Sequence, residues 1–348
     1  MKRKILVTGG AGYIGSHTII ELLNNGFDVV AADNYSNSTP QTYERIFQIT
    51  QQRIAFEEID LSNLQATQRF FQKHSEISGI IHFAALKSVP ESVEDPLHYY
   101  GNNLNSLLNV LQCAVQFNIP NFIFSSSCSV YGNVAELPVN ESTATGEIAS
   151  PYAFTKLAGE RILQDFIVKY KDYRGIALRY FNPVGAHISG KLGELPTNRP
   201  NNLVPLITQV AIGKLPMLRV FGKDYDTRDG TCIRDYIHVS DIAEAHVLAL
   251  KHLFDNGADK ARYSLFNLGS GTGTSVLEAI KAFEKAAGVQ LKFEITERRP
   301  GDVSAIYSDS TLAKNTLGWI PKYTIDEMMA SAWKWELELA NHGDKIRL

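Results

Sequence analysis

A glycine-rich turn near the start of the chain constrains the fold more than any other stretch. A β-branched strand is predicted over Lys4–Thr8, the turn Gly9–Gly15 follows it, and an amphipathic helix is predicted from there to a stop at Asn25-Gly26. Glycines 10, 12 and 15 fit G-x-G-x-x-G, in which missing side chains let the backbone approach a pyrophosphate at the helix N-terminus. This order of elements predicts a dinucleotide-binding fold.

An acidic residue at the end of the next strand strengthens this interpretation. A strand is predicted over Asp28–Ala32, and Asp33 follows it, 18 residues beyond Gly15. A carboxylate there accepts hydrogen bonds from the adenosine ribose hydroxyls, and since no Arg directly follows it, NAD is favoured over NADP. The alternative is a structural glycine turn with an ordinary surface Asp.

Strand-like and helix-like segments then alternate along the chain. Strands are predicted over 54–59, 79–84, 121–126 and 175–180, with helices over about 62–74 and 96–117 and a long helix from Tyr152. Such alternation predicts an α/β fold with a Rossmann-type, doubly wound parallel sheet. The strand ends that would converge at the ligand edge carry Gly9, Asp33, Asp60, Phe83-Ala84-Ala85, Ser127 and Phe181-Asn182.

The segment Ser150–Lys156 has the pattern of a catalytic helix start. Ser150 is a good N-cap and Pro151 a good first helical residue, so Tyr152 and Lys156 share one face at i, i+4 spacing. An ammonium close to the phenol favours phenolate, so we expect Tyr152 to act as a base near neutral pH. Ser127, 25 residues earlier, is expected to meet it. The alternative is a lysine stem packed on an aromatic ring.

The 348-residue length favours one large domain with a smaller second lobe. We predict an NAD-binding Rossmann domain over residues 1–182, to which segments of about 235–270 return, and a mainly substrate-binding lobe over 183–348. Arg234 and Arg299 are candidates to clamp a diphosphate, although isolated arginines often form surface ion pairs. His238 is expected to be structural.

Composition and charge limit the kinds of molecule that we expect the protein to bind. A net charge of −3 gives no reason to expect nucleic acid or a membrane surface, and no stretch approaches the ~18 apolar residues of a membrane span. Three scattered cysteines argue against disulfides or a metal site and favour the cytoplasm. The helix over 96–117 is apolar on more than one face, which predicts a homodimer; burial against another helix of the same chain is the alternative.

Several longer motifs resemble one family. Together with the glycine turn, they are Ser125-Ser126-Ser127, Tyr152-x-x-x-Lys156, Tyr180-Phe181-Asn182-Pro183-Val184-Gly185-Ala186-His187 and Arg234-Asp235-Tyr236-Ile237-His238-Val239. From Ile5 to about Trp335 the chain resembles the extended short-chain dehydrogenase/reductases, and among them the UDP-glucose 4-epimerases. The resemblance implies a resident NAD and a UDP-sugar substrate.

It also implies roles for individual residues. Tyr152 would be the base, with Lys156 and the positive nicotinamide lowering its pKa and Ser127 hydrogen-bonding it or relaying the proton. The NAD contacts would be Gly9, Gly12, Tyr13, Ile14, Gly15, Asp33, Asn34, Asn37, Ser38, Asp60, Leu61, Phe83, Ala84, Ala85, Lys87, Asn102, Ser127, Tyr152, Lys156 and Phe181. The UDP-sugar contacts would be Ser127, Tyr152, Asn182, Asn202, Leu203, Arg219, Phe221, Arg234, Arg299, Asp302 and Ile306.

Two departures from the family pattern bear on competing functions. Cys128-Ser129 stands where related nucleotide-sugar dehydratases carry Asp-Glu, so their elimination would lack its acid. A catalytically silent NAD sensor would commonly lack the Tyr and the Lys, and this chain retains both. Ile306 is intermediate between the Tyr that goes with non-acetylated sugars and the small residue that goes with N-acetylhexosamines, so a UDP-N-acetylhexosamine 4-epimerase is an alternative.

Overall fold

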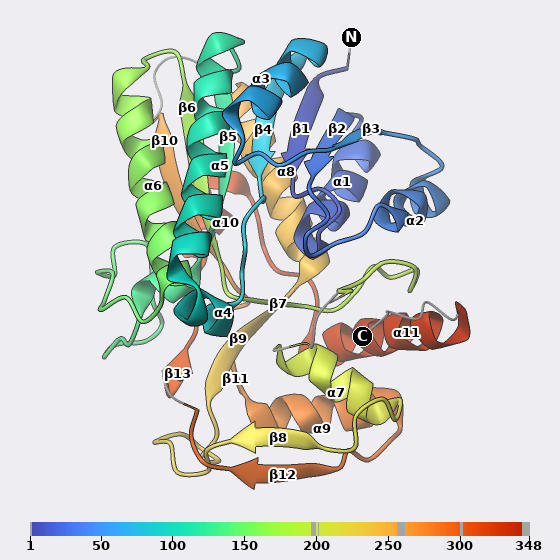
Figure 1. Cartoon of the computed structure of the whole chain (residues 1–348). Helices are drawn as coiled ribbons and strands as arrows, with labels where there is room; N and C mark the ends of the chain where they lie inside the picture. The colour runs from blue at the N-terminus through green and yellow to red at the C-terminus, as the bar shows by residue number, and fades with distance from the viewer. Residues whose placement is uncertain (1, 196–199, 201, 256–261, 300–301, 343–348) are drawn as a thin grey trace.

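Seven parallel strands form the large sheet of the computed structural model, which describes residues 2–195, 200, 202–255, 262–299 and 302–342 (Figure 1). Their order across the sheet is β10 (Tyr263–Leu268), β6 (Arg174–Tyr180), β5 (Asn121–Ser127), β4 (Ile77–His82), β1 (Lys4–Thr8), β2 (Asp28–Asp33) and β3 (Ala55–Glu58). The predicted Rossmann-type parallel sheet is therefore confirmed.

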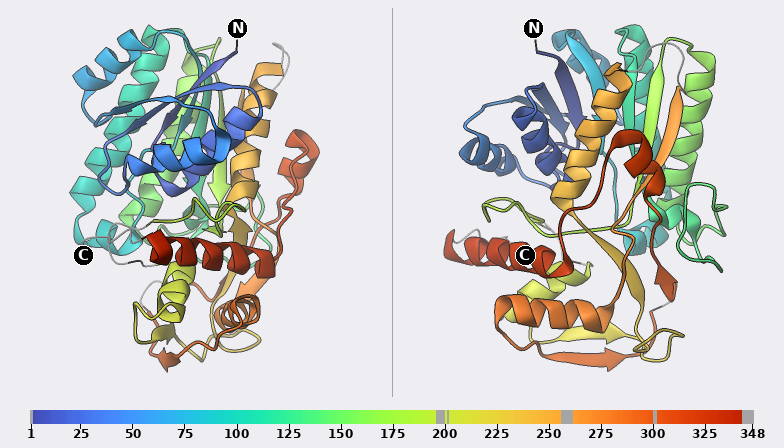
Figure 2. Two further views of the ribbon diagram at one scale, coloured as in Figure 1. Left: turned by 90° about the vertical axis from the view of Figure 1, so that its right-hand side faces the viewer. Right: turned by 180° about the vertical axis from the view of Figure 1, so that it is seen from behind.

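Helices cover both faces of this sheet, because alternate side chains of each strand point to opposite sides. Ile5 and Val7 of β1 pack in one core with α1 (Tyr13–Asn24) and α8 (Val239–Asp255). Leu6, between them, packs in a second core with α3 (Leu64–Lys73), α5 (Pro96–Gln116) and α6 (Pro151–Lys169). Figure 2 shows the sheet between these two helical layers.

The strand order reverses at the middle of the sheet and fixes where a ligand binds. From β1 the chain builds β2 and β3 on one side, and then crosses to build β4, β5 and β6 on the other. The loops that follow β1 and β4 leave the sheet side by side, and a Cβ added to Gly9 would lie 2.9 Å from the Ala84 nitrogen. Open α/β sheets bind their ligands in the crevice at this reversal.

A smaller lobe lies against the carboxyl ends of these strands (Figure 1). It contains a four-stranded sheet built on β9 (Ile233–His238), which pairs with β7 (Asn182–Val184), β11 (Gly273–Ser275) and β13 (Ala305–Ile306). A two-stranded sheet joins β8 (Leu218–Phe221) and β12 (Phe293–Thr296). The helices α7 (Leu203–Ala211), α9 (Val276–Ala287) and α11 (Ile325–His342) pack in its core, and α10 (Thr311–Leu317) packs with α8 and β10.

The predicted strands and helices of the large sheet are present, with two helices missed and one strand shifted. The helices α2 (Gln41–Thr50) and α4 (Val89–Glu94) were not predicted, because α2 begins after Pro40 without a capping side chain and α4 has only six residues. The strand predicted to reach Ala84 ends at His82. The Phe83 N–H still donates to the Thr8 backbone carbonyl oxygen as well as to the Thr8 hydroxyl, whereas the Ala84 N–H donates to that hydroxyl instead of continuing the ladder.

Four buried histidines make the stability of the fold depend on pH. Burial lowers the pKa of His17 and His82 to about 3 and that of His238 and His246 to about 4. Because an unfolded His titrates near ~6.5, the unfolded chain binds more protons below that pH. We expect the free energy of unfolding to fall as pH drops from about 6.5 toward about 4, by up to about 1.4 kcal/mol per pH unit for each His.

Urea unfolding at a series of pH values checks this expectation. His82→Asn should reduce the slope of the free energy of unfolding against pH by the contribution of one proton. The same change at exposed His98 is the control and should leave this slope unchanged. A free energy of unfolding that stays flat between about pH 7 and pH 5 would contradict the neutral state of these imidazoles.

Candidate active site

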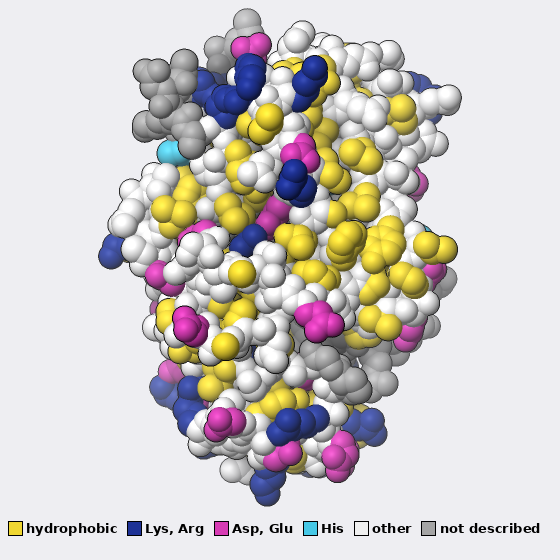
Figure 3. Space-filling view, turned by 90° about the vertical axis from the view of Figure 1, so that its left-hand side faces the viewer, with side chains coloured by type: hydrophobic (Ala, Val, Ile, Leu, Met, Phe, Trp, Pro, Cys, Tyr) yellow, Lys and Arg dark blue, Asp and Glu magenta, His cyan; other side chains and the backbone are white. Residues whose placement is uncertain are grey.

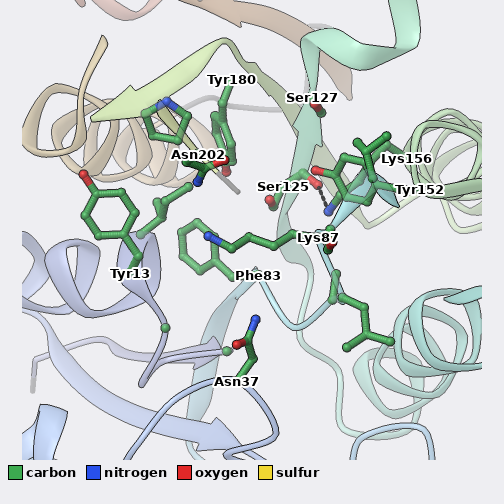
Figure 4. A pocket seen from close by; sticks show the side chains of 18 of the residues that line it. Tyr13, Asn37, Phe83, Lys87, Ser125, Ser127, Tyr152, Lys156, Tyr180 and Asn202 are labelled. Carbon is green, nitrogen blue, oxygen red and sulfur yellow. Dashed lines mark hydrogen bonds between the residues drawn. The ribbon is translucent and has the colours of Figure 1, made fainter. Parts of the chain in front are cut away.

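A cavity of about 940 Å³ opens where the carboxyl ends of the large sheet meet the smaller lobe. Its lining comes from the loops after β1, β2, β4, β5 and β6, from the start of α6 and from the lobe. Figure 4 shows Tyr152, Lys156 and Ser127 on one side of it and Tyr13 and Asn202 on the other. Its volume is at the upper end of the range for small-molecule sites, as two extended ligands require.

The glycine turn forms one end of the cavity, and its backbone is too closely packed for larger residues. A Cβ on Gly15 would lie 2.3 Å from the Gly9 carbonyl oxygen, and Gly9 itself has a φ of +66°. Gly12, at the N-cap of α1, has no side chain that could occupy the space beside the first helical N–H groups. This turn therefore fits a pyrophosphate at the positive end of the helix dipole.

Asp33 joins the loops around the predicted adenosine end. Its carboxylate accepts hydrogen bonds from the backbone nitrogens of Ala11, at 2.9 Å, and Tyr35, at 3.0 Å, and from the Ser38 hydroxyl, at 2.8 Å. The side chain is buried and lines the cavity. Its role is thus wider than sequence alone indicated, because it fixes the glycine turn as well as lining the cavity.

The catalytic helix begins as its sequence predicts. The Ser150 hydroxyl accepts from the Ala153 nitrogen at 3.2 Å and caps α6. Lys156 extends back along the helix, with Nζ 5.8 Å from the centre of the Tyr152 ring, and donates to the Ser125 carbonyl oxygen at 2.8 Å (Figure 4). Ser127 caps the 3₁₀ turn η1 (Cys128–Tyr131) and lines the same cavity.

The pKa of Tyr152 differs from the sequence-based expectation. Burial raises the pKa of its phenol to about 12, and a hydrogen bond with Ser127 opposes that shift. Burial likewise lowers the pKa of Lys156 to about 8, which its neighbour Glu160 opposes. In the protein without a ligand, the effect of burial on the pKa of Tyr152 is larger than the effect of the Lys156 charge. The phenol therefore needs a further positive charge nearby to act as a base at neutral pH.

The lobe side of the cavity contributes two arginines held by one acid. Arg299 Nη2 donates to Asp302 Oδ1 at 2.7 Å, and Arg234 Nη2 lies 3.5 Å from the same oxygen. All three residues line the cavity. The neighbouring Asp235 points away into the lobe, where its buried carboxylate accepts from Ser270 and Ser308 and fixes two loops. Sequence reasoning quoted Asp235 but assigned it no role.

Residues 5–269 match the NAD dependent epimerase/dehydratase family. The chain belongs to this family. It is 47% identical over 332 residues to the UDP-glucose 4-epimerase of Pasteurella multocida, covering 95% of this chain and 97% of that protein. The crystal structure of UDP-glucose 4-epimerase from Bifidobacterium longum in complex with NAD⁺ and UDP superposes with a TM-score of 0.92 at 48% identity, covering 97% and 99% of the two chains.

A second solved structure is similar to the same extent. UDP-glucose-4-epimerase from Stenotrophomonas maltophila with bound NAD and formylated UDP-arabinopyranose has a TM-score of 0.93 at 43% identity and covers 98% of this chain and all of that one. NAD is the cofactor of the epimerase/dehydratase family, and the glycine turn has the space and Asp33 the acceptor oxygens that it requires. The described residues hold no group of three or more His, Cys, Asp or Glu side chains placed for a metal ion.

The cavity of this epimerase/dehydratase family member contains every residue that the sequence analysis proposed for NAD. Of the residues proposed for the UDP-sugar, Leu203, Arg219 and Phe221 do not line it. Arg219 is exposed on β8 and its Nε lies 3.3 Å from Glu294.

Sequence reasoning missed Glu194, which lines the cavity from the lobe. Its Oε1 accepts from Lys87 Nζ at 2.8 Å and from Asn202 Nδ2 at 3.0 Å, and so joins one proposed cofactor contact to one proposed substrate contact. Only the fold brings these three together, because 107 residues separate Glu194 from Lys87.

In the described part of the chain, no helix has the length and apolar character needed to span a membrane.

Proposed function

We propose that this protein interconverts UDP-glucose and UDP-galactose by inverting C4 of the hexose. The observation that supports this most directly is the placement of Tyr152, Ser127 and Lys156 in one cavity that the glycine turn and two arginines also line. The relatives named above are UDP-glucose 4-epimerases, and this chain matches them along nearly their whole length. The chain would accordingly be an isomerase of galactose metabolism.

The residues at the site divide the work of such a reaction. When bound, NAD would accept a hydride and later return it, and its positive charge would offset the rise in the pKa of Tyr152 that burial causes. Tyr152 takes the proton of the sugar 4-hydroxyl at its phenolic oxygen and later returns it, and Ser127 hydrogen-bonds that oxygen. Lys156, held on the Ser125 carbonyl, keeps a positive charge beside the phenolate.

The UDP part of the substrate is proposed to stay in place while the 4-ketose turns over. Arg234 and Arg299 present guanidinium groups from two separate segments of the lobe, and both suit a diphosphate. Ile306, which is buried and lines the cavity, is proposed to face the sugar. An isoleucine leaves less room than a small residue, so non-acetylated hexoses are the proposed substrates and UDP-N-acetylhexosamines the alternative.

Incubation of the purified protein with UDP-galactose, without added cofactor, tests this function. We expect the anomeric proton signals of UDP-glucose to appear, because NAD stays bound through purification. A parallel incubation with UDP-N-acetylgalactosamine distinguishes the alternative substrate class. No conversion of either sugar, even with NAD added, would reject epimerisation and favour the NAD sensor.

A homodimer through α5 and α6 is part of the proposal. Leu97, on α5, is 80% exposed, and Leu108 and Phe154 are also exposed on these two adjacent helices. Figure 3 shows hydrophobic side chains gathered on this side of the molecule. A two-fold partner that repeats the same pair of helices would cover them.

The three cysteines are free, which supports the proposal of a reducing, cytoplasmic location.

A charge in this face should separate the subunits. We expect Leu97→Glu combined with Leu108→Glu to convert a dimer into a monomer, because each substitution is repeated across the two-fold axis and buries like charges. Sedimentation equilibrium measures the mass directly. Leu312→Glu, on exposed α10 at the other layer of helices, is the matched control and should leave the mass unchanged. A monomeric unmodified protein would contradict the proposed dimer.

A further inference from the structure

A buried ion pair that the proposed chemistry does not use lies against the catalytic helix. The Arg179 guanidinium of β6 donates two parallel hydrogen bonds to the Glu160 carboxylate of α6, Nε to Oε1 at 2.8 Å and Nη2 to Oε2 at 2.7 Å. The two side chains are only 5% and 7% exposed. Burying such a pair costs desolvation that apolar residues of similar size avoid, so its presence at this place needs a reason.

Two adjacent residues of β5 connect the pair to Lys156. Ser126 is the cross-strand partner of Arg179, and its hydroxyl donates a short hydrogen bond to Glu160. The preceding residue, Ser125, accepts the Lys156 ammonium at its carbonyl oxygen, at 2.8 Å. The carboxylate and the ammonium are thus held by neighbouring residues of one strand, and they come from positions one turn apart on α6.

We propose that Glu160 is a positioning residue for the reaction, whose carboxylate keeps the Lys156 ammonium protonated beside Tyr152. Arg179 orients that carboxylate through its two parallel hydrogen bonds. The catalytic part of this inference rests on the proposed function. From the cavity into the core, the side chains then follow one another as a phenol, a cation, an anion and a cation, which belong to Tyr152, Lys156, Glu160 and Arg179.

The other groups around Lys156 cannot supply this negative charge. From α6 it faces the Tyr152 phenol, and from β4 it faces His82, whose pKa is lowered to about 3 by burial and by the charge of Lys156. From β5 it lies 5.3 Å from the centre of the Phe124 ring. In the protein without NAD, Tyr152 and His82 are neutral near pH 7, so Glu160 is the anion among these groups before the phenol ionises. Burial lowers the pKa of Lys156 to about 8, although Glu160 opposes this loss of charge.

On its other sides Glu160 faces Arg179 from β6 and the Tyr263 phenol from β10. A purely structural role, pinning α6 to the sheet, would need the contacts but not the charge. The two accounts therefore differ in the protonation of Lys156, which is directly measurable.

The experiment measures the pKa of Lys156 in the NAD-bound protein by NMR of lysine labelled with ¹³C at Cε, with the signal assigned by its loss in Lys156→Met. Glu160→Gln removes the anion and leaves Arg179 charged. Glu160→Gln with Arg179→Met removes both charges, so no buried charge is left alone if the single variant fails to fold. Ser126→Ala is the control that keeps both charges and loses one contact.

We expect the pKa of Lys156 to fall by about one unit in the double variant and by more in the single one, with no change in Ser126→Ala. The alkaline limb of kcat for UDP-galactose should move down by the same amount, with KM within about twofold. An unchanged Lys156 pKa in a folded charge variant, or an equal shift in Ser126→Ala, overturns the inference. If the unmodified protein turns over no UDP-galactose, the proposed function fails, while the NMR titration still decides the role of Glu160.

Discussion

Replacing Tyr152 by Phe is expected to lower kcat for UDP-galactose by about 10³-fold, the middle of the range for removing a general base. Phe keeps the ring beside Lys156 and the shape of the cavity, so NAD should remain bound in the purified protein. Turnover measured together with the NAD content of each preparation separates loss of chemistry from loss of cofactor.

The matched control is Tyr173→Phe. Tyr173 is buried before β6, outside the cavity, and its hydroxyl donates to the Ala114 carbonyl oxygen at 3.2 Å. This variant should lose a little stability and keep its turnover. A Tyr152→Phe protein that retains more than about a tenth of the unmodified kcat would remove Tyr152 from the role of base.

Adding a single methyl group to the glycine turn should abolish cofactor binding. In Gly15→Ala the new Cβ would lie 2.3 Å from the Gly9 carbonyl oxygen, which is backbone and cannot swing aside. We expect α1 to move away from the turn, the free energy of unfolding to fall by about 3 kcal/mol and the bound NAD to fall at least about tenfold. Urea unfolding and the nucleotide released on denaturation measure the two effects.

Gly101→Ala is the same change on another helix, with open space around the added methyl group. Alanine is the better helix former, so this variant should gain roughly 0.5–1 kcal/mol and keep its NAD. If Gly15→Ala also kept its NAD, the close approach at the turn would not be what the cofactor needs.

Local patterns in the sequence were enough to predict six of the seven strands of the large sheet, all but β10. The continuous apolar run of β1, the N-cap of α6 and the glycine turn each act over a few residues, and each has one structural solution. The cofactor side of the cavity follows from them, because parallel strands end at one edge. The missed helix α2 begins after Pro40 with no capping side chain, so no local signal marked its start.

The remaining parts of the site depend on contacts between distant segments. Glu194 meets Lys87 only after the lobe has folded against the sheet, and no spacing in the chain indicates it. The charge of Lys156 is visible in the sequence, whereas the burial that raises the pKa of Tyr152 in the protein without NAD is not. Glu160, four residues after Lys156, had a visible signal in its spacing, but its partner Arg179 lies on another strand.

The edge strand β10 has a consequence for how the protein is made. Residues 263–268 complete the large sheet beside β6, and α8 packs on α1, yet both follow the segments that build β7, β8 and β9 of the lobe. A ribosome must therefore synthesise much of the lobe before the first domain can close. A nascent chain that stops near residue 182 would expose the edge of β6 and the apolar side of α1. Stable cofactor capture should then begin only late in translation, and the two lobes should unfold together rather than one after the other.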